Sequence, residues 1–211
     1  MGGFGREVMP EPDAYIRVSA QPGTTSELVF VVTGAPPSRE VNGFPVLTEE
    51  EFLGREGPKL FNVAIADGEV RRTVADRLIS GGARPISIQS STSVIHKHNS
   101  IGEGAIFCAG SIVTSNATIG RFFHCNLQSY VAHDCVVGDF VTFAPAVRCN
   151  GNIIVEDGAY IGTGATLRQG TREKPLRIGR GAVVGMGAVV TKDVPAGEVW
   201  VGNPAKKLHR S

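Results

Sequence analysis

The sequence predicts a left-handed parallel β-helix that follows a small α/β domain, and three observations support this fold class. An apolar residue recurs at every sixth position from Ile95 to Leu167. Glycine follows that apolar residue at several turns of the repeat. Residues before position 86 lack the repeat and instead mix β-rich runs with one helical stretch. We therefore expect an α/β domain at residues 1–85, the β-helix at residues 86–191 and a C-terminal tail at residues 192–211.

The first domain contains both strand and helix signals. Glu27 to Thr33 and Leu60 to Ala66 are apolar and β-rich, which predicts two strands. The stretch that follows carries apolar residues at helical i, i+4 and i+8 spacing, namely Val70, Val74 and Leu78. We expect the arginines of that helix to face solvent: Arg71, Arg72 and Arg77. Gly81 is the expected C-cap.

The six-residue repeat defines the second domain. Thirteen successive repeat positions are apolar: Ile95, Ile101, Phe107, Val113, Ile119, Cys125, Val131, Val137, Phe143, Cys149, Val155, Ile161 and Leu167. A helix repeats its apolar stripe every 3.6 residues, so the period excludes helices. Three six-residue faces make one triangular coil, and stacked coils lie roughly 4.8 Å apart as parallel strands. After five extra residues the register resumes at Ile178. We expect the glycines that follow repeat residues, such as Gly102 and Gly120, to give the chain freedom to turn each corner.

Composition and charge exclude several classes of protein. Lys plus Arg number 21 and Asp plus Glu 20, for a net charge of +1, so we expect no nucleic-acid partner. The longest clean apolar run, Leu28 to Val32, is too short to cross a membrane. The first residues do not have the order of a secretory signal, and the four cysteines are not spaced like a disulfide framework or a CxxC metal pair. We expect a cytoplasmic protein with reduced, buried cysteines.

One histidine is placed where it could act as a general base. His133 is followed by Asp134, and a neighbouring carboxylate raises the basicity of an imidazole and fixes its tautomer. One full coil beyond His133 lies Gly151, whose backbone N–H could stabilise an oxyanion beside the imidazole. For His124 a structural role and a site role are both open. The remaining histidines are expected at the surface: His96, His98 and His209.

A second column of residues could form the edge of a groove. Thr163 and Met186 are related by one coil plus the five extra residues, and glycines flank Met186. The insertion at residues 168–177, together with Arg180, carries five cations against one acid. A solvated loop and a phosphate contact for a long anionic cofactor are both compatible with this charge.

Several motifs resemble the NeuD-type sugar acetyltransferases of the hexapeptide-repeat superfamily. They are VAHDCVVGDF at residues 131–140, GRGAVVGMGAVVTKDVP at 179–195, GNPAK at 202–206, GGFGREV at 2–8 and NGFPV at 42–46. The resemblance covers nearly the whole chain. It implies a Rossmann-like first domain and a homotrimer that uses acetyl-CoA, and no metal, to acetylate a sugar. The acceptor implied is the amine of a nucleotide-linked amino sugar, in bacterial surface glycan biosynthesis.

The resemblance also assigns roles to residues. It implies that His133 is the general base, that Asp134 is its partner and that the Gly151 N–H holds the thioester oxygen. Cofactor contacts are implied at Thr142, Thr163 and Met186, and the insertion arginines expected beside them are Arg168 and Arg172. Substrate contacts are implied at Gly2, Gly3, Phe4 and Asn126.

The sequence departs from the family pattern at four places. Thr142 and Phe4 stand where several relatives carry histidine, and Met1 lies inside the glycine turn that a first strand normally precedes. The stretch from Val31 to Gly34 lacks the acidic pair that family members use toward the nucleotide. The identity of the nucleotide therefore stays open.

Three alternative functions stay open beside N-acetylation. O-acetylation of sialic acid or a related sugar needs the same site. A zinc carbonic anhydrase can share this prism but needs three converging histidines, and only His124 and His133 lie in the middle of the repeat. A non-catalytic scaffold would need neither acetyl-CoA nor zinc.

Overall fold

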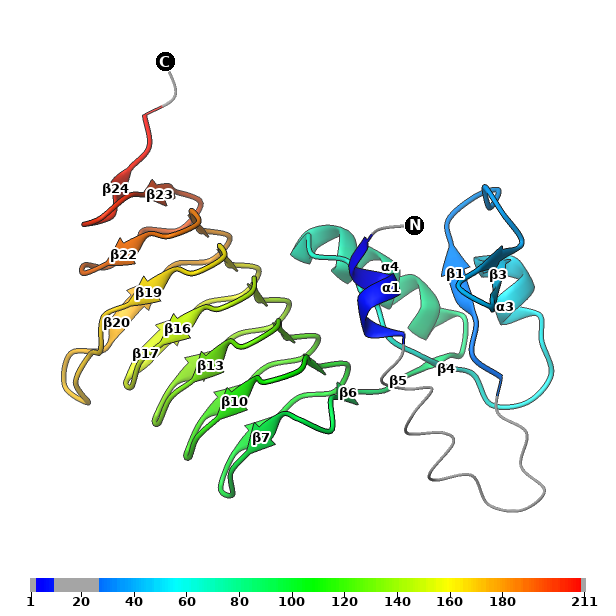
Figure 1. Ribbon diagram of the computed structural model, residues 1–211, viewed down its shortest axis with the longest axis horizontal. Coiled ribbons are helices and arrows are strands. Elements are labelled where there is room, and N and C mark those ends of the chain that lie inside the picture. Colours follow the sequence, from blue (N-terminus) through cyan, green and yellow to red (C-terminus); the bar gives the residue numbers. More distant parts are fainter. Residues whose placement is uncertain (1–2, 10–26, 210–211) are drawn as a thin grey trace.

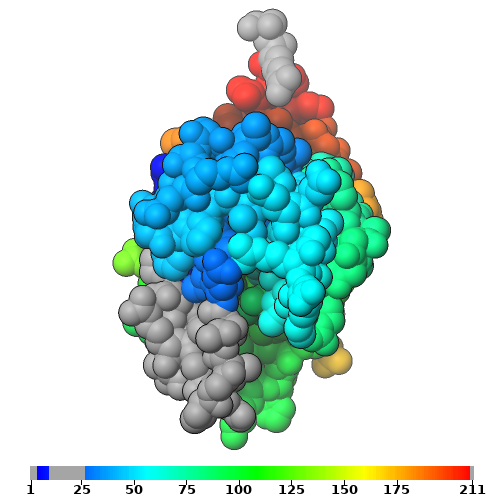
Figure 2. Space-filling view, turned by 90° about the vertical axis from the view of Figure 1, so that its right-hand side faces the viewer, coloured from blue at the N-terminus to red at the C-terminus, as the bar shows by residue number. Residues whose placement is uncertain are grey.

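The computed structural model describes residues 3–9 and 27–209, which form a three-sided prism and a smaller N-terminal unit at one end of it (Figure 1). Figure 2 views the molecule from that end, where residues of the N-terminal unit, in blue and cyan, lie in front of the prism. Among the described residues no helix is long and apolar enough to span a membrane.

The N-terminal unit consists of short helices and two small sheets. Its elements are α1 (Gly3–Val8), β1 (Phe30–Val32), β2 (Glu40–Val41), β3 (Phe44–Thr48), α3 (Glu49–Leu53), β4 (Leu60–Phe61), α4 (Gly68–Ser80) and β5 (Arg84–Pro85). β1 pairs in parallel with β3, and β4 pairs in parallel with β5. β1 and β4 belong to separate sheets, and the residues of both line a cavity of about 400 Å³.

The prism has three faces, and each is a sheet of short parallel strands from successive coils, with one antiparallel strand added to face 1. Face 1 contains β6 (Ile88–Gln89), β9 (Ile106–Phe107), β12 (His124–Cys125), β15 (Thr142–Phe143), β18 (Tyr160–Ile161), β21 (Val183–Val184), β23 (Val199–Val201) and the antiparallel β24 (Lys206–Lys207). Face 2 contains β7 (Val94–Ile95), β10 (Ile112–Val113), β13 (Tyr130–Val131), β16 (Arg148–Cys149), β19 (Thr166–Leu167) and β22 (Val189–Val190). Face 3 contains β8 (Ser100–Ile101), β11 (Thr118–Ile119), β14 (Val136–Val137), β17 (Ile153–Val155) and β20 (Leu176–Ile178).

The register of the strands confirms the six-residue repeat. Val113 pairs with Val131, exactly one coil further along the chain, and Ile161 pairs with Val184 beyond the five extra residues. Repeat residues from Phe107 to Val190 are at most 2% exposed and form the continuous core of the prism. Each coil alone cannot bury its apolar residues, so stacking supplies the stability. The tail expected at residues 192–211 contains β23, which pairs with β21 and extends face 1 of the prism.

The glycines after the repeat residues serve a different purpose from the expected one. A Cβ on Gly102 would lie 2.7 Å from the backbone nitrogen of Arg121, and one on Gly162 would lie 2.6 Å from that of Met186. Their role is therefore to let the next coil approach closely. Positive φ occurs two residues later instead, at every sixth position from His98 to Gly164.

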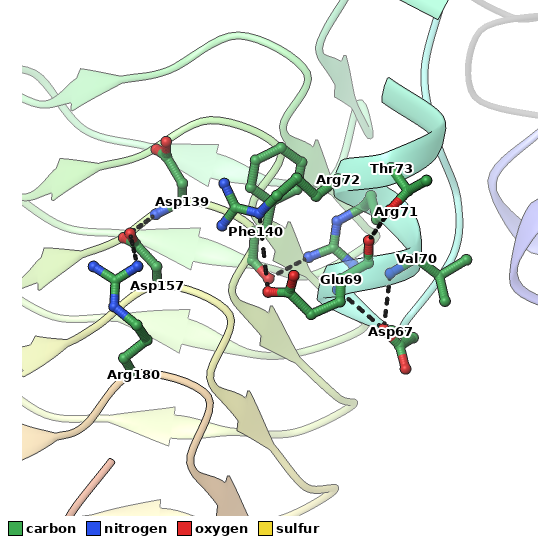
Figure 3. Close-up of polar contacts among 10 residues, drawn as sticks. All are labelled: Asp67, Glu69, Val70, Arg71, Arg72, Thr73, Asp139, Phe140, Asp157 and Arg180. Carbon is green, nitrogen blue, oxygen red and sulfur yellow. Dashed lines mark hydrogen bonds and ion pairs between the residues drawn. The ribbon is translucent and has the colours of Figure 1, made fainter. Parts of the chain in front are cut away.

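Helix α4 attaches the N-terminal unit to the prism through a buried arginine (Figure 3). Arg71 is 0% exposed and donates hydrogen bonds to the carbonyl oxygens of Phe140 (2.7 Å) and Phe122 (3.0 Å) and to Thr142 Oγ1 (3.0 Å). Burial lowers the pKa of Arg71 to about 9, so the guanidinium is charged at neutral pH. The expectation that Arg71 faces solvent is therefore wrong, and Val70, expected inside, is 48% exposed. The face of α4 that is buried packs against backbone carbonyls at the prism corner. These carbonyls need hydrogen-bond donors, and only a long donor side chain on α4 reaches them.

Stacked aromatic rings complete this junction. Phe122 and Phe140 lie in successive coils with ring centroids 5.1 Å apart and an interplanar angle of 9°. Phe61 of the N-terminal unit stacks on Phe122, and the guanidinium of Arg72 lies 4.2 Å above the ring of Phe140. Figure 3 shows Arg72 over this ring. The N-terminal unit is thus fixed against the corner between faces 3 and 1.

Candidate active site

His133, Asp134 and Gly151 come together at the corner between faces 2 and 3. Each coil turns this corner after its face 2 strand, so the residues after β13 and those after β16 lie one above the other. Backbone hydrogen bonds fix both turns, because Asp134 N–H donates to Ser115 O at 3.2 Å and Asn152 N–H donates to His133 O at 3.0 Å. The prediction that a step of one coil places Gly151 beside His133 is confirmed.

The imidazole of His133 is oriented by its neighbour. Its Nδ1 lies 2.7 Å from Asp134 Oδ2, which fixes the tautomer with the proton on Nδ1. Asp134 adopts a left-handed conformation, with φ of 58°, which turns its carboxylate back toward the ring. The side chain of His133 is 46% exposed, and its Nε2 has no hydrogen-bond partner among the described residues. This nitrogen is therefore free to accept a proton from a ligand.

Gly151 is buried, and its backbone amide lies beneath the imidazole. A Cβ at this position would lie 2.5 Å from both Nε2 and Cε1 of His133, so only glycine leaves room for the ring. Within the described part of the chain, the N–H of Gly151 donates to no acceptor. A base and an unpaired amide donor thus meet at one point, which is what acyl transfer requires.

The insertion at residues 168–177 follows directly above this corner. Gly170 N–H donates to Gly151 O at 3.0 Å, so the loop begins against the proposed oxyanion donor. Arg177 and Arg180 form ion pairs with acids of the coil below, at 3.9 Å from Glu156 and 3.1 Å from Asp157. The expected group of five cations is therefore partly neutralised. Three exposed cations of the loop have no ion pair within the described residues: Arg168, Arg172 and Lys174.

Other predicted site residues lie at a different corner of the same chain. Asn126, Thr163 and Met186 follow strands of face 1 and line the corner between faces 1 and 2. Gly187 N–H donates to Thr163 O at 2.8 Å, which confirms that these two coils are stacked, and Met186 is 81% exposed. Face 2 separates this corner from His133 within one chain.

Thr142 is buried and does not line an open groove. It is 3% exposed, its hydroxyl donates to Ala66 O at 2.7 Å, and it accepts a hydrogen bond from Arg71. The expectation that Thr142 contacts the cofactor is therefore wrong for this arrangement, because α4 covers the position.

The predicted N-terminal substrate residues lie over face 1. Phe4 of α1 packs against the ring of His124, with centroids 5.1 Å apart. Gly3 begins α1, and Gly2 lies outside the described residues. His124 is 0% exposed, and its Nε2 bonds Val63 O at 3.0 Å. Burial, reinforced by the charge of Arg71, holds the pKa of His124 well below its usual value, so the imidazole is neutral at pH 7.

Sequence reasoning missed the residues that hold the turn at Gly151. Tyr130 Oη donates to Asn150 Oδ1 at 2.8 Å, and Asn150 Nδ2 donates to Leu167 O at 2.7 Å. The Cys135 thiol lies 3.1 Å from Asn150 O. The 18-residue step could have predicted this contact. It places Arg148 in register with Tyr130, so Asn150, two residues further on, lies next to Tyr130. Among the described residues no three His, Cys, Asp or Glu side chains converge as a metal site.

Known proteins are similar to this chain along its whole length. No family model matches it. The GDP-perosamine N-acetyltransferase of Escherichia coli O157:H7 is 47% identical over 213 residues, which cover 100% of this chain and 94% of that protein. The structure of WeeI from Acinetobacter baumannii AYE matches with a TM-score of 0.92 and 48% identity over 98% of this chain and 96% of WeeI. PerB from Caulobacter crescentus, solved with CoA and GDP-perosamine, matches with a TM-score of 0.83 and 25% identity over 99% and 94% of the two chains.

Proposed function

Because this chain belongs to the hexapeptide-repeat acetyltransferases, we propose that it transfers the acetyl group of acetyl-CoA to the amine of a nucleotide-linked amino sugar. Acetyl-CoA is the acetyl donor. The observation that carries the proposal is the contact between the His133 imidazole and Gly151. Among the described residues neither His133 Nε2 nor the Gly151 N–H has a hydrogen-bond partner. The first acceptor to test is GDP-perosamine, the substrate in the name of the Escherichia coli relative.

The residues at the corner supply proton transfer and charge stabilisation. His133 Nε2 accepts a proton from the acceptor amine as the amine nitrogen bonds to the acetyl carbon and the bond to sulfur breaks. The Gly151 N–H donates a hydrogen bond to the acetyl oxygen, which gains negative charge during the transfer. His133 then returns the proton to the departing sulfur. Asp134 stabilises the imidazolium and keeps Nε2 directed outward.

The loop and the second corner would hold the remainder of the donor. We assign phosphate contacts to Arg168 and Arg172, since both are exposed cations beside the Gly151 corner and neither is neutralised by an acid of the described residues. Thr163 and Met186 lie at the corner between faces 1 and 2, so they can complete the same site only from a neighbouring protomer. Gly2, Gly3, Phe4 and Asn126 remain proposed acceptor contacts.

A homotrimer would bring the two corners together. The N-terminal unit covers face 1 through α1 and α4, whereas faces 2 and 3 carry exposed apolar residues on either side of His133. Ile112 on face 2 is 39% exposed and Val136 on face 3 is 44% exposed. Subunit contacts on these faces would bury that apolar surface. Light scattering at micromolar concentration should give three chains, and a monomer would contradict the proposal.

Replacing His133 with alanine tests the function. We expect His133→Ala to lower kcat by roughly 10² to 10⁴, with the melting temperature nearly unchanged because the side chain is half exposed. His96→Ala, the same change at another exposed histidine, is the matched control and should be fully active. Retention of more than a third of wild-type kcat by His133→Ala at every pH, with both substrates saturating, would remove the base assignment.

An acceptor panel separates the alternative functions. It contains GDP-, UDP- and dTDP-linked amino sugars together with free sialic acid, and each is incubated with acetyl-CoA. Turnover of an amino sugar supports N-acetylation, whereas turnover of sialic acid alone would favour O-acetylation. A protein that neither binds acetyl-CoA in a thermal-shift assay nor acetylates any member of the panel would be a scaffold. Buried thiols at Cys125, Cys135 and Cys149 suit a reducing compartment, and we expect the reaction in the cytoplasm.

A further inference from the structure

The peptide group that joins Asn150 to Gly151 is held from both sides of the prism wall. On the inner side, the thiol of Cys135 lies 3.1 Å from the carbonyl oxygen of Asn150. On the outer side, the amide of Asn150 accepts a hydrogen bond from Tyr130 Oη and donates one to Leu167 O. The turn that carries the proposed oxyanion donor is therefore fixed by side chains as well as by backbone pairing.

The inner contact determines where the Gly151 N–H points. In a trans peptide the C=O and N–H bonds of one unit point in opposite directions. Since the carbonyl of Asn150 is directed toward a sulfur in the prism core, the N–H of Gly151 in the same peptide unit is directed away from that core. The imidazole of His133 lies on that outer side. A donor to the carbonyl also polarises the peptide and makes its N–H a stronger donor, because linked hydrogen bonds reinforce one another.

Cys135 itself cannot reach a substrate. It is 0% exposed and belongs to the core of the prism, with the sulfur of Cys149 at 4.0 Å as a neighbour. Yet it follows His133 and Asp134 in the chain and contacts the turn of Gly151 in the next coil. Its sulfur lies 3.7 Å from His133 O and 3.1 Å from Asn150 O, so the shorter contact is with the turn of Gly151.

We propose that Cys135 is a positioning residue for acetyl transfer, whose thiol orients the Gly151 N–H toward the acetyl oxygen and strengthens it as a donor. This inference rests on the proposed function. Removing an oxyanion donor lowers kcat by about 10² to 10³. Loss of the group that only supports the donor should have a smaller effect, on the order of tenfold.

The test compares Cys135→Ala with Cys125→Ala. Cys125 is also 0% exposed in the prism core, and its thiol donates to Ser129 O at the corner between faces 1 and 2. Cys125→Ala therefore deletes the same atoms away from Gly151. We expect Cys135→Ala to lower kcat about tenfold while the KM for acetyl-CoA and the Kd for CoA stay within twofold of wild type. Cys125→Ala should keep wild-type kcat although it creates a similar cavity. Cys135→Ser retains a donor and should recover part of the lost kcat.

A spectroscopic measurement separates this inference from the proposed function. In the His133→Ala background, acetyl-CoA labelled with ¹³C at its carbonyl can be bound without rapid turnover and its carbonyl stretch recorded by infrared spectroscopy. Adding Cys135→Ala should shift that band to higher frequency, as a weaker hydrogen bond predicts, and adding Cys125→Ala should not. Equal kcat values for the two cysteine variants, or an unchanged band, would overturn the role of Cys135 while the His133 result stands.

Discussion

Replacing Gly151 with alanine tests whether the base and the amide act as one unit. The new Cβ would lie 2.5 Å from Nε2 and Cε1 of His133. Carbon atoms normally approach only to about 3.5–4.0 Å, so the imidazole must move by roughly 1 Å. Gly151 is not among the glycines with positive φ, so its backbone accepts alanine without strain. The substitution therefore displaces the base and leaves the amide donor in place.

A displacement of this size is large for catalysis and small for stability. Misplacing a catalytic group by about 1 Å lowers the rate on the order of 10²-fold, and we expect that loss in kcat. The ring of His133 is 46% exposed and can swing into solvent instead of straining the coil. The free energy of unfolding should therefore fall by less than about 1 kcal/mol.

The assay follows release of the CoA thiol at saturating acetyl-CoA and acceptor, with unfolding in urea measured in parallel. Gly181→Ala is the matched control. Its Cβ would meet nothing within 4 Å, but its φ of 62° makes alanine unfavourable by about 1 to 2 kcal/mol. This variant should lose stability and keep kcat, the reverse of Gly151→Ala.

The decisive comparison uses a His133→Ala background. Without the imidazole the methyl group of Ala at position 151 meets no ring, so Gly151→Ala should lower the residual kcat by less than about twofold. An equal loss in both backgrounds would show that the methyl group acts through the turn and not through His133. Wild-type kcat in the single variant Gly151→Ala would equally refute the reasoning.

Three further outcomes are expected. Changing Arg168, Arg172 and Lys174 to serine should raise the KM for acetyl-CoA about tenfold and leave the KM for a short thioester unchanged. Equal increases in KM for both donors would refute a phosphate contact. His124 takes up a proton below pH 6.5 in the unfolded chain but stays neutral in the folded chain, because burial lowers its pKa. The free energy of unfolding should therefore fall by up to about 2 kcal/mol by pH 5. Urea titrations of His124→Gln should not show this fall. Arg71→Met leaves the carbonyls at the prism corner unpaired and should lower the free energy of unfolding in urea by about 3 kcal/mol or more. The control Arg72→Met removes only a cation–π contact and should lower it by about 1 kcal/mol.

The sequence was sufficient to predict the repeat of the prism and the contact between His133 and Gly151. The six-residue period and the three-faced coil are set by backbone stacking, so they convert sequence distance directly into spatial distance. His133 and Gly151 were placed together on this basis, and the structure confirms their contact. The same step confirms the stacking of Thr163 with Met186.

Contacts between distant segments could not be predicted in this way. The helical pattern of Val70 suggested an apolar buried face, but α4 packs on a corner that exposes backbone carbonyls, and these require Arg71. Thr142 occupies a face 1 position that looks open within the repeat and is closed only by α4.

The insertion after β19 has a consequence for how this scaffold can be altered. Ile154 pairs with Arg177 across one coil plus the five extra residues, whereas Val136 pairs with Ile154 across one coil alone, and face 3 continues without a break. The surplus chain leaves at one corner and returns in register, as the loop between β19 and β20 in Figure 1 illustrates. Loops of other lengths and charges could thus be grafted between Leu167 and Leu176, provided that the contact of Gly170 with Gly151 is kept. If the loop contacts the phosphates of CoA, as proposed above, such grafts would change specificity for the acyl carrier without altering the residues that transfer the acetyl group.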